Sequence, residues 1–290
     1  MLMLLTLVMA GCADTESRRA SSEHARAVAE AREARLASFF APTGYLSYQV
    51  SGRLTTGRHR IGSGPENRIR LPEGPAFAGW LDVGSEQLRV MDPHGRVLAR
   101  TDRPRDELSK WPVTLPDGTL TVVRIGDYLG WRYQSAQAPA STPFKGFAYF
   151  PVDGRWRITA QWRPYLQLQP VLVTTSSGGV LELQSPGEAR FVLQGHQGVL
   201  RAVLSPTGDG RLMLMFRDRT NGKESFGGGR YLYVPMPVGR TMELDFNQAV
   251  NPACVVTPHL VCPIPPPESY LDVAVLAGER DWDPGSQSAG

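Results

Sequence analysis

Long apolar runs and basic clusters are both scarce in this sequence. The apolar run from Met1 to Ala10 has about ten residues, which is about half of what a membrane-spanning helix needs. The 31 Lys and Arg side chains stand against 28 Asp and Glu, so the formal net charge is only +3, and no basic run is interleaved with aromatic residues. A nucleic-acid groove requires such a run, so the sequence argues against nucleic acid as a partner.

The usual signatures of catalysis are also missing. No Gly-x-Ser-x-Gly elbow occurs, and the 5 His residues are scattered along the chain. The triplet Gly227 to Gly229 is not followed by Lys-Ser or Lys-Thr, as a phosphate loop would be, and we expect a bulge there instead. The sequence predicts no cofactor, and it favours a protein that is not an enzyme.

Cysteine is rare, with only 3 residues in the chain. Cys12 ends the segment Met9-Ala10-Gly11-Cys12, which resembles a bacterial lipobox, the signal at which an exported chain is cut and lipidated on its new N-terminal Cys. The resemblance implies that residues 1–20 are an export signal and tether. It also implies a lipoprotein of the bacterial cell envelope, anchored to the membrane through Cys12 and facing the periplasm or the exterior.

Cys254 and Cys262 remain as a pair, for which we expect a disulfide in an oxidising compartment. A metal site is the sharper alternative, made of Cys254, His259 and Cys262 with Asp245 or Glu268 as fourth ligand. Its spacing, C-x4-H-x2-C, is not a recognised zinc spacing. Free buried thiols are the third possibility, and the sequence favours the disulfide and no metal.

Glycine and proline are abundant: 30 Gly and 24 Pro make up 54 of the 290 residues, well above the share of roughly 12% that the two have in average proteins. The composition predicts a mainly β protein with two sandwich-like or barrel-like lobes. One surface helix is expected within residues 21–40, because SSEHARAVAEAREARLAS is rich in Ala, Glu and Arg and offers Ser22 as an N-cap. Val28, Leu36 and Phe39 would pack on the β structure, and the charged face would be solvated.

Residues 41–134 are expected to form the first lobe, a small β-sandwich, because short alternating segments are separated by Gly, Pro and Asp. Its segment RHRIGSGPENRIRLP, residues 58–72, resembles the opening of a forkhead-associated phosphopeptide-binding domain. That family has an Arg where this chain has Ser63, and a Ser-x-x-His near the place of Phe77-Ala78-Gly79. We therefore expect the fold without phosphopeptide binding.

A Pro- and Ala-rich linker, residues 135–143, leads to a second β lobe, residues 143–282, which contains a Cys- and Pro-rich loop. A hairpin is expected around the turn Ser205 to Gly210. Two segments of this lobe, FRDRTNGKESFGGGRYLY and DFNQAVNPACVVTPHLVCPIPPPESYLDVAVLAGER, resemble the bacterial and archaeal domain-of-unknown-function 1684 family. The resemblance extends over about residues 30–280 and implies a two-lobed β-rich fold with no assigned reaction.

The loop from Asp245 to Glu268 is the candidate site. Its 6 Pro residues rule out a continuous helix or a central strand, so we expect a rigid, irregular loop. Polar residues of the loop and of strands expected beneath it make up a candidate ligand-binding or structural centre: Arg217, Asp218, Arg230, Asp245, Asn247, Asn251 and Glu268.

Two functions fit this candidate centre. An Arg beside carboxylates can bind an anionic or polyhydroxy small molecule, which predicts a non-enzymatic binding or envelope-interaction module. The alternative is a small-molecule hydrolase that uses the carboxylates of Asp245 and Glu268, with His259 as a base. A buried network that only satisfies the loop's own backbone is the structural alternative to both. An open pocket lined by these side chains would favour a ligand or substrate site.

Overall fold

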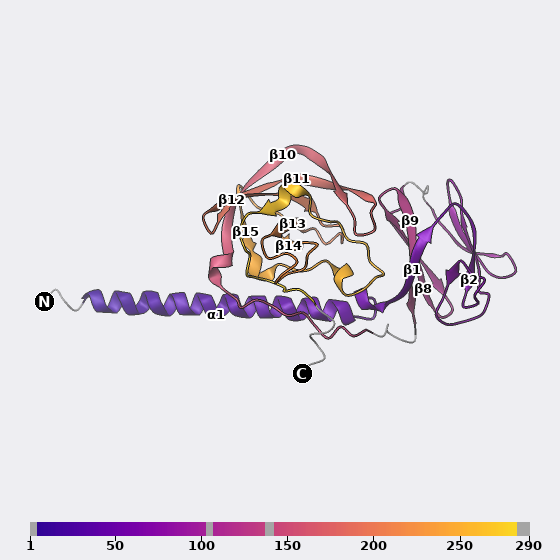
Figure 1. Cartoon of the computed structure of the whole chain (residues 1–290), viewed down its shortest axis with the longest axis horizontal. Coiled ribbons are helices and arrows are strands. Elements are labelled where there is room, and N and C mark those ends of the chain that lie inside the picture. Colours follow the sequence, from indigo (N-terminus) through magenta and orange to yellow (C-terminus); the bar gives the residue numbers. More distant parts are fainter. Residues whose placement is uncertain (1–4, 103–106, 137–141, 283–290) are drawn as a thin grey trace.

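The computed structural model describes residues 5–102, 107–136 and 142–282, with side chains described from Arg18 onward. It contains one long helix and two β lobes (Figure 1). The prediction of a mainly β protein with one N-terminal helix is confirmed.

Helix α1 spans Leu5–Phe40, so it begins well before the residues expected from the sequence. Ser22 is not its N-cap: it lies inside the helix, where its hydroxyl donates to the carbonyl of Arg19 at 2.8 Å. The helix ends just before Pro42, because the proline ring disfavours helical backbone in the residue that precedes it. No helix within the described residues has both the length and the apolar character that crossing a membrane requires.

The first lobe is a β-sandwich of two sheets. One sheet has the order β1-β9-β8-β7 and the other β3-β2-β4-β5-β6. Alternate residues of both sheets point inward and form a common core, which includes Ile61, Leu81 and Val122. The strands are β1 (Tyr48–Leu54), β2 (Gly57–Gly62), β3 (Ile69–Arg70), β4 (Gly79–Val83), β5 (Leu88–Met91), β6 (Val97–Arg100), β7 (Lys110–Leu115), β8 (Gly118–Ile125) and β9 (Tyr128–Ser135).

The second lobe is a strongly curled antiparallel sheet with the order β14-β13-β12-β11-β10-β15, and the short β16 adds to β13 in parallel (Figure 1). The expected hairpin at Ser205 to Gly210 joins β12 to β13. The strands are β10 (Arg157–Thr174), β11 (Val180–Leu193), β12 (His196–Leu204), β13 (Leu212–Asp218), β14 (Arg230–Val234), β15 (Thr241–Asp245) and β16 (Tyr270–Leu271).

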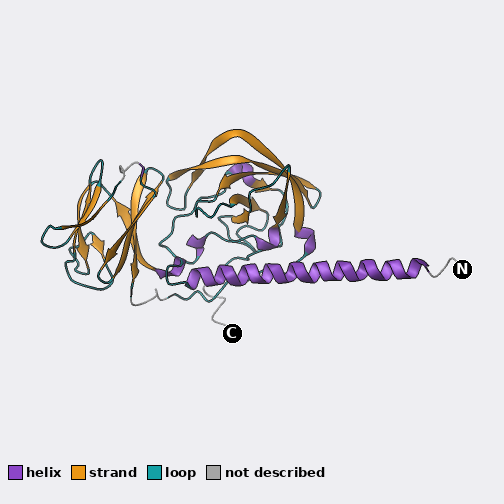
Figure 2. Cartoon of the chain, turned by 180° about the vertical axis from the view of Figure 1, so that it is seen from behind, coloured by secondary structure: helices purple, strands orange, loops and turns teal. Residues whose placement is uncertain are grey.

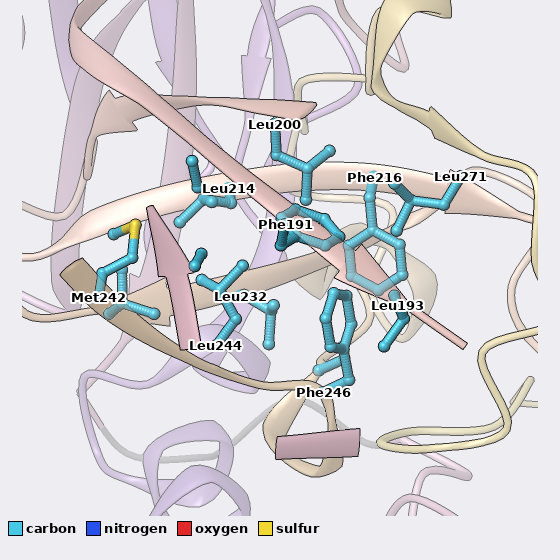
Figure 3. Packing of buried hydrophobic residues seen from close by; sticks show 14 of the residues in the cluster. Phe191, Leu193, Leu200, Leu214, Phe216, Leu232, Met242, Leu244, Phe246 and Leu271 are labelled. Atoms are coloured by element: carbon cyan, nitrogen blue, oxygen red, sulfur yellow. The ribbon is translucent and has the colours of Figure 1, made fainter. Parts of the chain in front are cut away.

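The core of the second lobe lies on the concave side of this sheet. Phe191, Phe216 and Phe246 meet there in tilted and edge-to-face contacts, with ring centroids 5.3 to 6.0 Å apart (Figure 3). Leu200, Leu214 and neighbouring aliphatic side chains surround them (Figure 3). Phe246 belongs to the loop after β15, so burial of its ring holds the start of the Pro-rich loop against the sheet.

Helix α1 runs along the second lobe, and its N-terminal part extends beyond the lobe (Figures 1 and 2). As expected, Val28 and Phe39 are fully buried, and Leu36 packs against the cluster that contains Phe39. Phe39 contacts Phe144 and Phe147, with ring centroids 5.7 and 5.3 Å away. The expectation that the charged face is simply solvated was wrong, because several of its charged side chains reach into the second lobe.

Candidate functional site

The Pro-rich loop leaves β15 at Asp245, whose carboxylate is almost fully used within the protein. One oxygen accepts from the backbone and side-chain amides of Asn247 at 3.1 and 2.8 Å. The other lies 2.8 Å from His24 Nε2 and 3.1 Å from Gln248 Nε2. Burial alone would raise the pKa of Asp245, but the hydrogen bonds from Gln248, His24 and Asn247 outweigh it and lower the pKa.

Asn247 is equally committed. Its side-chain oxygen accepts from the backbone amide of Asp153 at 3.0 Å, and its amide donates to the carbonyl of the same residue at 2.9 Å. This reciprocal pair ties the loop to the chain that enters β10. Asp245 and Asn247 therefore hold the loop in place, and they leave few polar atoms for a ligand.

Arg230 forms a second buried group. Its side chain is fully buried and donates to Asp218 Oδ2 at 2.8 Å, to the Val275 carbonyl at 2.8 Å and to the Ala277 carbonyl. The other Asp218 oxygen accepts from the amide and the hydroxyl of Thr220. Burial lowers the pKa of Arg230, while the charge of Asp218 opposes that effect. The structure thus brings two of the candidate residues together as an internal ion pair.

Glu279 is the centre of a third buried group, which the sequence did not indicate. Its carboxylate is ion-paired with Arg35 from α1 and accepts from the Asn251 amide at 2.6 Å. Arg35 also donates to the Asn251 carbonyl at 2.6 Å, and the Asn251 side chain donates to the Arg280 carbonyl at 2.7 Å. Burial raises the pKa of Glu279 although Arg35 opposes it.

Helix α1 is therefore attached to the second lobe by polar side chains as well as by its apolar face. His24 bonds to Asp245, Arg35 pairs with Glu279, and Arg32 donates to the Phe150 carbonyl at 3.2 Å. The only sequence signal for these contacts was a helix rich in Arg, which more commonly indicates a solvated face. Their partners lie more than a hundred residues away in the chain, so local pattern could not identify them.

Two candidate residues stay outside these groups. Arg217 is exposed and donates to the Gly227 carbonyl at 3.1 Å. Glu268 is exposed, and no hydrogen bond or ion pair joins it to another of the described residues. Glu268 lies in the short helix Pro267–Ser269, and none of the contacts of Asp245 among the described residues involves it, so the expected convergence of these two carboxylates stays a prediction.

The two cysteines of the loop are free thiols, which differs from the expected disulfide. They are nevertheless close, because the Cys254 amide donates to Cys262 Sγ at 3.2 Å. The hydrogen bond between the two cysteines lowers the pKa of Cys254. The same contact, together with burial, raises the pKa of Cys262. His259 points elsewhere and lies 3.1 Å from Ser51 Oγ of the first lobe. No cluster of three or more His, Cys, Asp or Glu suited to a metal occurs within the described part of the chain.

An open cleft lies beside the buried polar groups. It has a volume of about 840 Å³ and is bounded by α1, by the loop segment Asn247 to Val250 and by the first lobe. Small-molecule sites commonly have volumes of about 300–1,000 Å³. Its lining contains one carboxylate, Asp209, and five cationic side chains: Arg32, Arg35, Lys110, Arg132 and Arg211.

The cations of the cleft differ in how far they are already paired. Arg35 is used by Glu279, and Arg211 binds Asp209 at 2.6 Å, which lowers the pKa of Asp209 to about 2. Lys110 is exposed without an ion-pair or hydrogen-bond partner among the described residues. Arg132 is half-buried, and its guanidinium carbon lies 5.4 Å from the centre of the Tyr48 ring. The wall formed by the first lobe therefore carries the uncommitted positive charge.

Tyrosines complete the lining of the cleft. Tyr45, Tyr48, Tyr149 and Tyr233 all face it. Burial, with the nearby charge of Glu279, raises the pKa of Tyr149 to about 12, so its hydroxyl stays protonated at neutral pH and can donate a hydrogen bond. Aromatic faces next to cations suit a ligand that has a ring or carbon skeleton and an anionic group.

The family match lies in the second lobe. Residues 142–280 match the family described as "Protein of unknown function (DUF1684)", a narrower range than the resemblance noted from the sequence. The chain is similar to an uncharacterized protein of Haloarcula marismortui studied by solution NMR, with 31% identity over 47% of this chain and 77% of that one and a TM-score of 0.40. No curated protein matches the chain.

Proposed function

We propose that this member of the DUF1684 family is a binding protein that holds an anionic small molecule in the cleft between α1 and the two lobes. The observation that carries the proposal is the composition of the cleft: of its five cationic side chains, Arg35 and Arg211 are ion-paired, and the other three have no ion pair among the described residues. Uncompensated cations in a concave, partly apolar space attract anions and gain strength from the reduced exposure to water.

The cations without an ion-pair partner determine how the ligand would be oriented in the cleft. Lys110 and Arg132 on the first lobe would receive the carboxylate or phosphate group, Arg132 with its planar fork and Lys110 as a point charge. The tyrosines of the other walls would contact the remainder of the ligand, and the Tyr149 hydroxyl is a suitable donor to sugar or alcohol oxygens. A polyhydroxy acid or a sugar phosphate has both features.

A binding role accounts for the buried polar groups better than hydrolysis does. Asp245 is saturated by amides and His24, Glu268 is exposed, and no contact joins the two carboxylates. Retaining and inverting glycosidases hold their carboxylates about 5 to 9.5 Å apart on either side of a bound substrate. The groups around Asp245 act instead as supports for the wall of the cleft.

The same proposal includes export and anchoring. Met9-Ala10-Gly11-Cys12 supports lipidation at Cys12, which would hold the protein at the surface of the bacterial envelope. In that oxidising compartment a disulfide oxidant would take two electrons and two protons from Cys254 and Cys262 and join their sulfurs. The closeness of the Cys254 amide to Cys262 Sγ supports this pairing.

The first lobe fits the same picture as a forkhead-associated-like sandwich without phosphopeptide binding. Ser63 stands where that family has an Arg, and its hydroxyl is used by the Gly74 carbonyl at 2.8 Å. No guanidinium is therefore available at this position for a phosphothreonine. Its role in the proposal is to supply one wall of the cleft.

Calorimetric titration tests the binding proposal. Glucuronate, citrate and inorganic phosphate serve as probes for the wild type and for the double variant Lys110→Gln/Arg132→Gln. We expect at least one probe to bind the wild type and the double variant to lose about tenfold or more in affinity, since each charge-assisted contact contributes about 1.5–3 kcal/mol.

Arg163→Gln is the matched control, because Arg163 is exposed on the second lobe and lies outside the cleft. It should leave the affinity unchanged. If no anionic probe binds, or if the control weakens binding as much as the double variant, the cleft is not an anion site.

A further inference from the structure

The outer face of the sheet β3-β2-β4-β5-β6 carries a row of charges that is independent of the cleft. Arg58 of β2 stands directly opposite Asp82 of β4, Asp82 opposite Arg89 of β5, and Arg89 opposite Arg100 of β6. Directly opposite residues of antiparallel strands project to the same face of the sheet. These four residues, the arginine row, therefore lie in one line across four strands.

One half of the arginine row is a completed charge ladder. Asp82 accepts from Arg58 through both oxygens, at 2.7 Å from Nε and 3.0 Å from Nη2, and it lies 3.8 Å from Arg89 Nη2. The hydrogen bond from Arg58 lowers the pKa of Asp82, although burial opposes it. A carboxylate seated between two arginines is thus already present in this face.

The other half of the arginine row lacks the corresponding acid. Arg89 and Arg100 face each other across β5 and β6, and like charges directly opposite are destabilising. Both are exposed, and Arg100 has no ion pair with any of the described residues, which do not include residues 103–106. The order of charge along the row is positive, negative, positive and positive, so one carboxylate between the last two would complete it.

The neighbouring aromatic rings indicate which anion suits this face. Arg60 lies 4.3 Å from the ring of Phe77 and 5.5 Å from that of Trp80, and Arg58 also lies 5.5 Å from Trp80. Guanidinium groups occupy these ring faces, so nucleobases find no free stacking platform. What remains for a partner is a flat line of guanidinium edges about three strand spacings long, or roughly 14 Å.

We propose that the arginine row docks an acidic polypeptide segment of a partner protein, in extended form, with an Asp or Glu carboxylate placed between Arg89 and Arg100. Arg58 and Asp82 show the geometry that such a contact takes on this face. Side chains on one side of an extended segment recur about every 6.7 Å, so the side chain two repeats from the carboxylate between Arg89 and Arg100 lies roughly 13 Å away, near the exposed side of Arg58.

Fluorescence anisotropy with a labelled oligoglutamate tests this proposal. Wild-type protein should bind the peptide, with an affinity that falls as salt is added. Arg100→Glu places the missing carboxylate opposite Arg89 within the protein itself. It should weaken peptide binding about tenfold or more while the melting temperature stays the same or rises, so loss of binding cannot be ascribed to unfolding.

Two comparisons make the result decisive. Arg163→Glu makes the same charge change on an exposed position of the second lobe and should leave peptide affinity unchanged. The proposal is overturned if oligoglutamate does not bind, if the two variants weaken it equally, or if polyphosphate or phosphatidylglycerol vesicles bind the row while oligoglutamate does not. The cleft variants at Lys110 and Arg132 should bind oligoglutamate normally, so failure of the cleft proposal remains distinguishable from failure here.

Discussion

Replacing Arg230 with Met should destabilise the second lobe strongly. Both Arg230 and Asp218 have fully buried side chains, and Nη2 of the arginine lies 2.8 Å from the carboxylate. The same guanidinium donates to the carbonyls of Val275, Ala277 and Glu279. Arg230→Met keeps an unbranched apolar chain in the space but removes every one of these donors, so the effect reports the polar contacts rather than a cavity.

The magnitude follows from what the substitution leaves behind. Removing one partner of a buried ion pair typically costs about 3–5 kcal/mol, because the other charge stays buried and unpaired. Asp218 would keep hydrogen bonds from the Thr220 amide and hydroxyl and from the Val275 amide, which moderates its own penalty. Carbonyls that lose a donor add about 1–3 kcal/mol each where water does not reach them. At roughly 2–4 °C per kcal/mol for a protein of this size, loss of the ion pair alone should lower the melting temperature by about 6–20 °C, and the carbonyls that lose a donor add to that fall.

Differential scanning calorimetry provides the measurement, and the adjacent exposed pair provides the control. Arg219 and Asp272 lie 2.7 Å apart with side chains 53% and 64% exposed, so Arg219→Met should cost no more than about 1 kcal/mol. Asp218→Asn combined with Arg230→Met should recover part of the loss, because no unpaired charge remains. A shift for Arg230→Met as small as that of the Arg219 variant would refute the reasoning.

Three further outcomes are expected from the loop and one from Cys12. Asp245→Asn should lower the melting temperature by its full amount at about pH 5, and the difference from wild type should disappear as the pH falls well below 3.8. The reason is that the pKa of Asp245 is lower in the folded than in the unfolded protein. The stability that this gives is present above the unfolded pKa and is lost as the pH falls through the folded pKa. Glu268→Gln should leave the free energy of unfolding within about 0.5 kcal/mol of wild type, because the residue is exposed and has no partner among the described residues; a larger loss would place Glu268 in a network after all. Cys254 and Cys262 should both resist alkylation in protein isolated from an oxidising compartment without reductant, and two alkylated thiols in intact-mass measurement would contradict the proposed disulfide. Cys12→Ser should move the protein from the membrane to the soluble envelope fraction, and unchanged fractionation would remove the lipid anchor from the proposal.

Local pattern was sufficient for much of the fold. Short alternating segments divided by Gly and Pro predicted the strands, and the hairpin at Ser205 to Gly210 formed where its turn residues indicated. Placing Arg230 and Asp218 in one candidate centre was also useful, since Asp218, twelve positions earlier in the chain, pairs with Arg230 across the β13–β14 hairpin. In each case the partners are close in sequence or belong to a regular period.

The contacts that organise the candidate site are of another kind. Arg35 and Glu279 are separated by 244 positions, and His24 and Asp245 by 221. The sequence around an Arg on a helix is the same whether its side chain is solvated or paired with a distant carboxylate, so composition could not distinguish these two environments. Glu268 shows a second limit: the prolines predicted an irregular loop, which the structure has, but proline spacing carries no information about which side chains of that loop face inward.

The division of labour between these residues explains why the cleft, and not the buried polar centre, is the place to expect a ligand. A ligand needs polar atoms that have no hydrogen-bond partner within the protein. Most polar atoms of Asp245, Asn247 and Arg230 already bond to amides, carbonyls or a carboxylate of the protein. Their contacts instead fix the Pro-rich loop, and through His24 they fix α1, which together form two walls of the cleft. Lys110 and Arg132 on the third wall retain free donors because nothing in the described chain requires them. Structural polar groups thus hold the walls, and Lys110 and Arg132 keep unpaired donors where the first lobe faces the cleft.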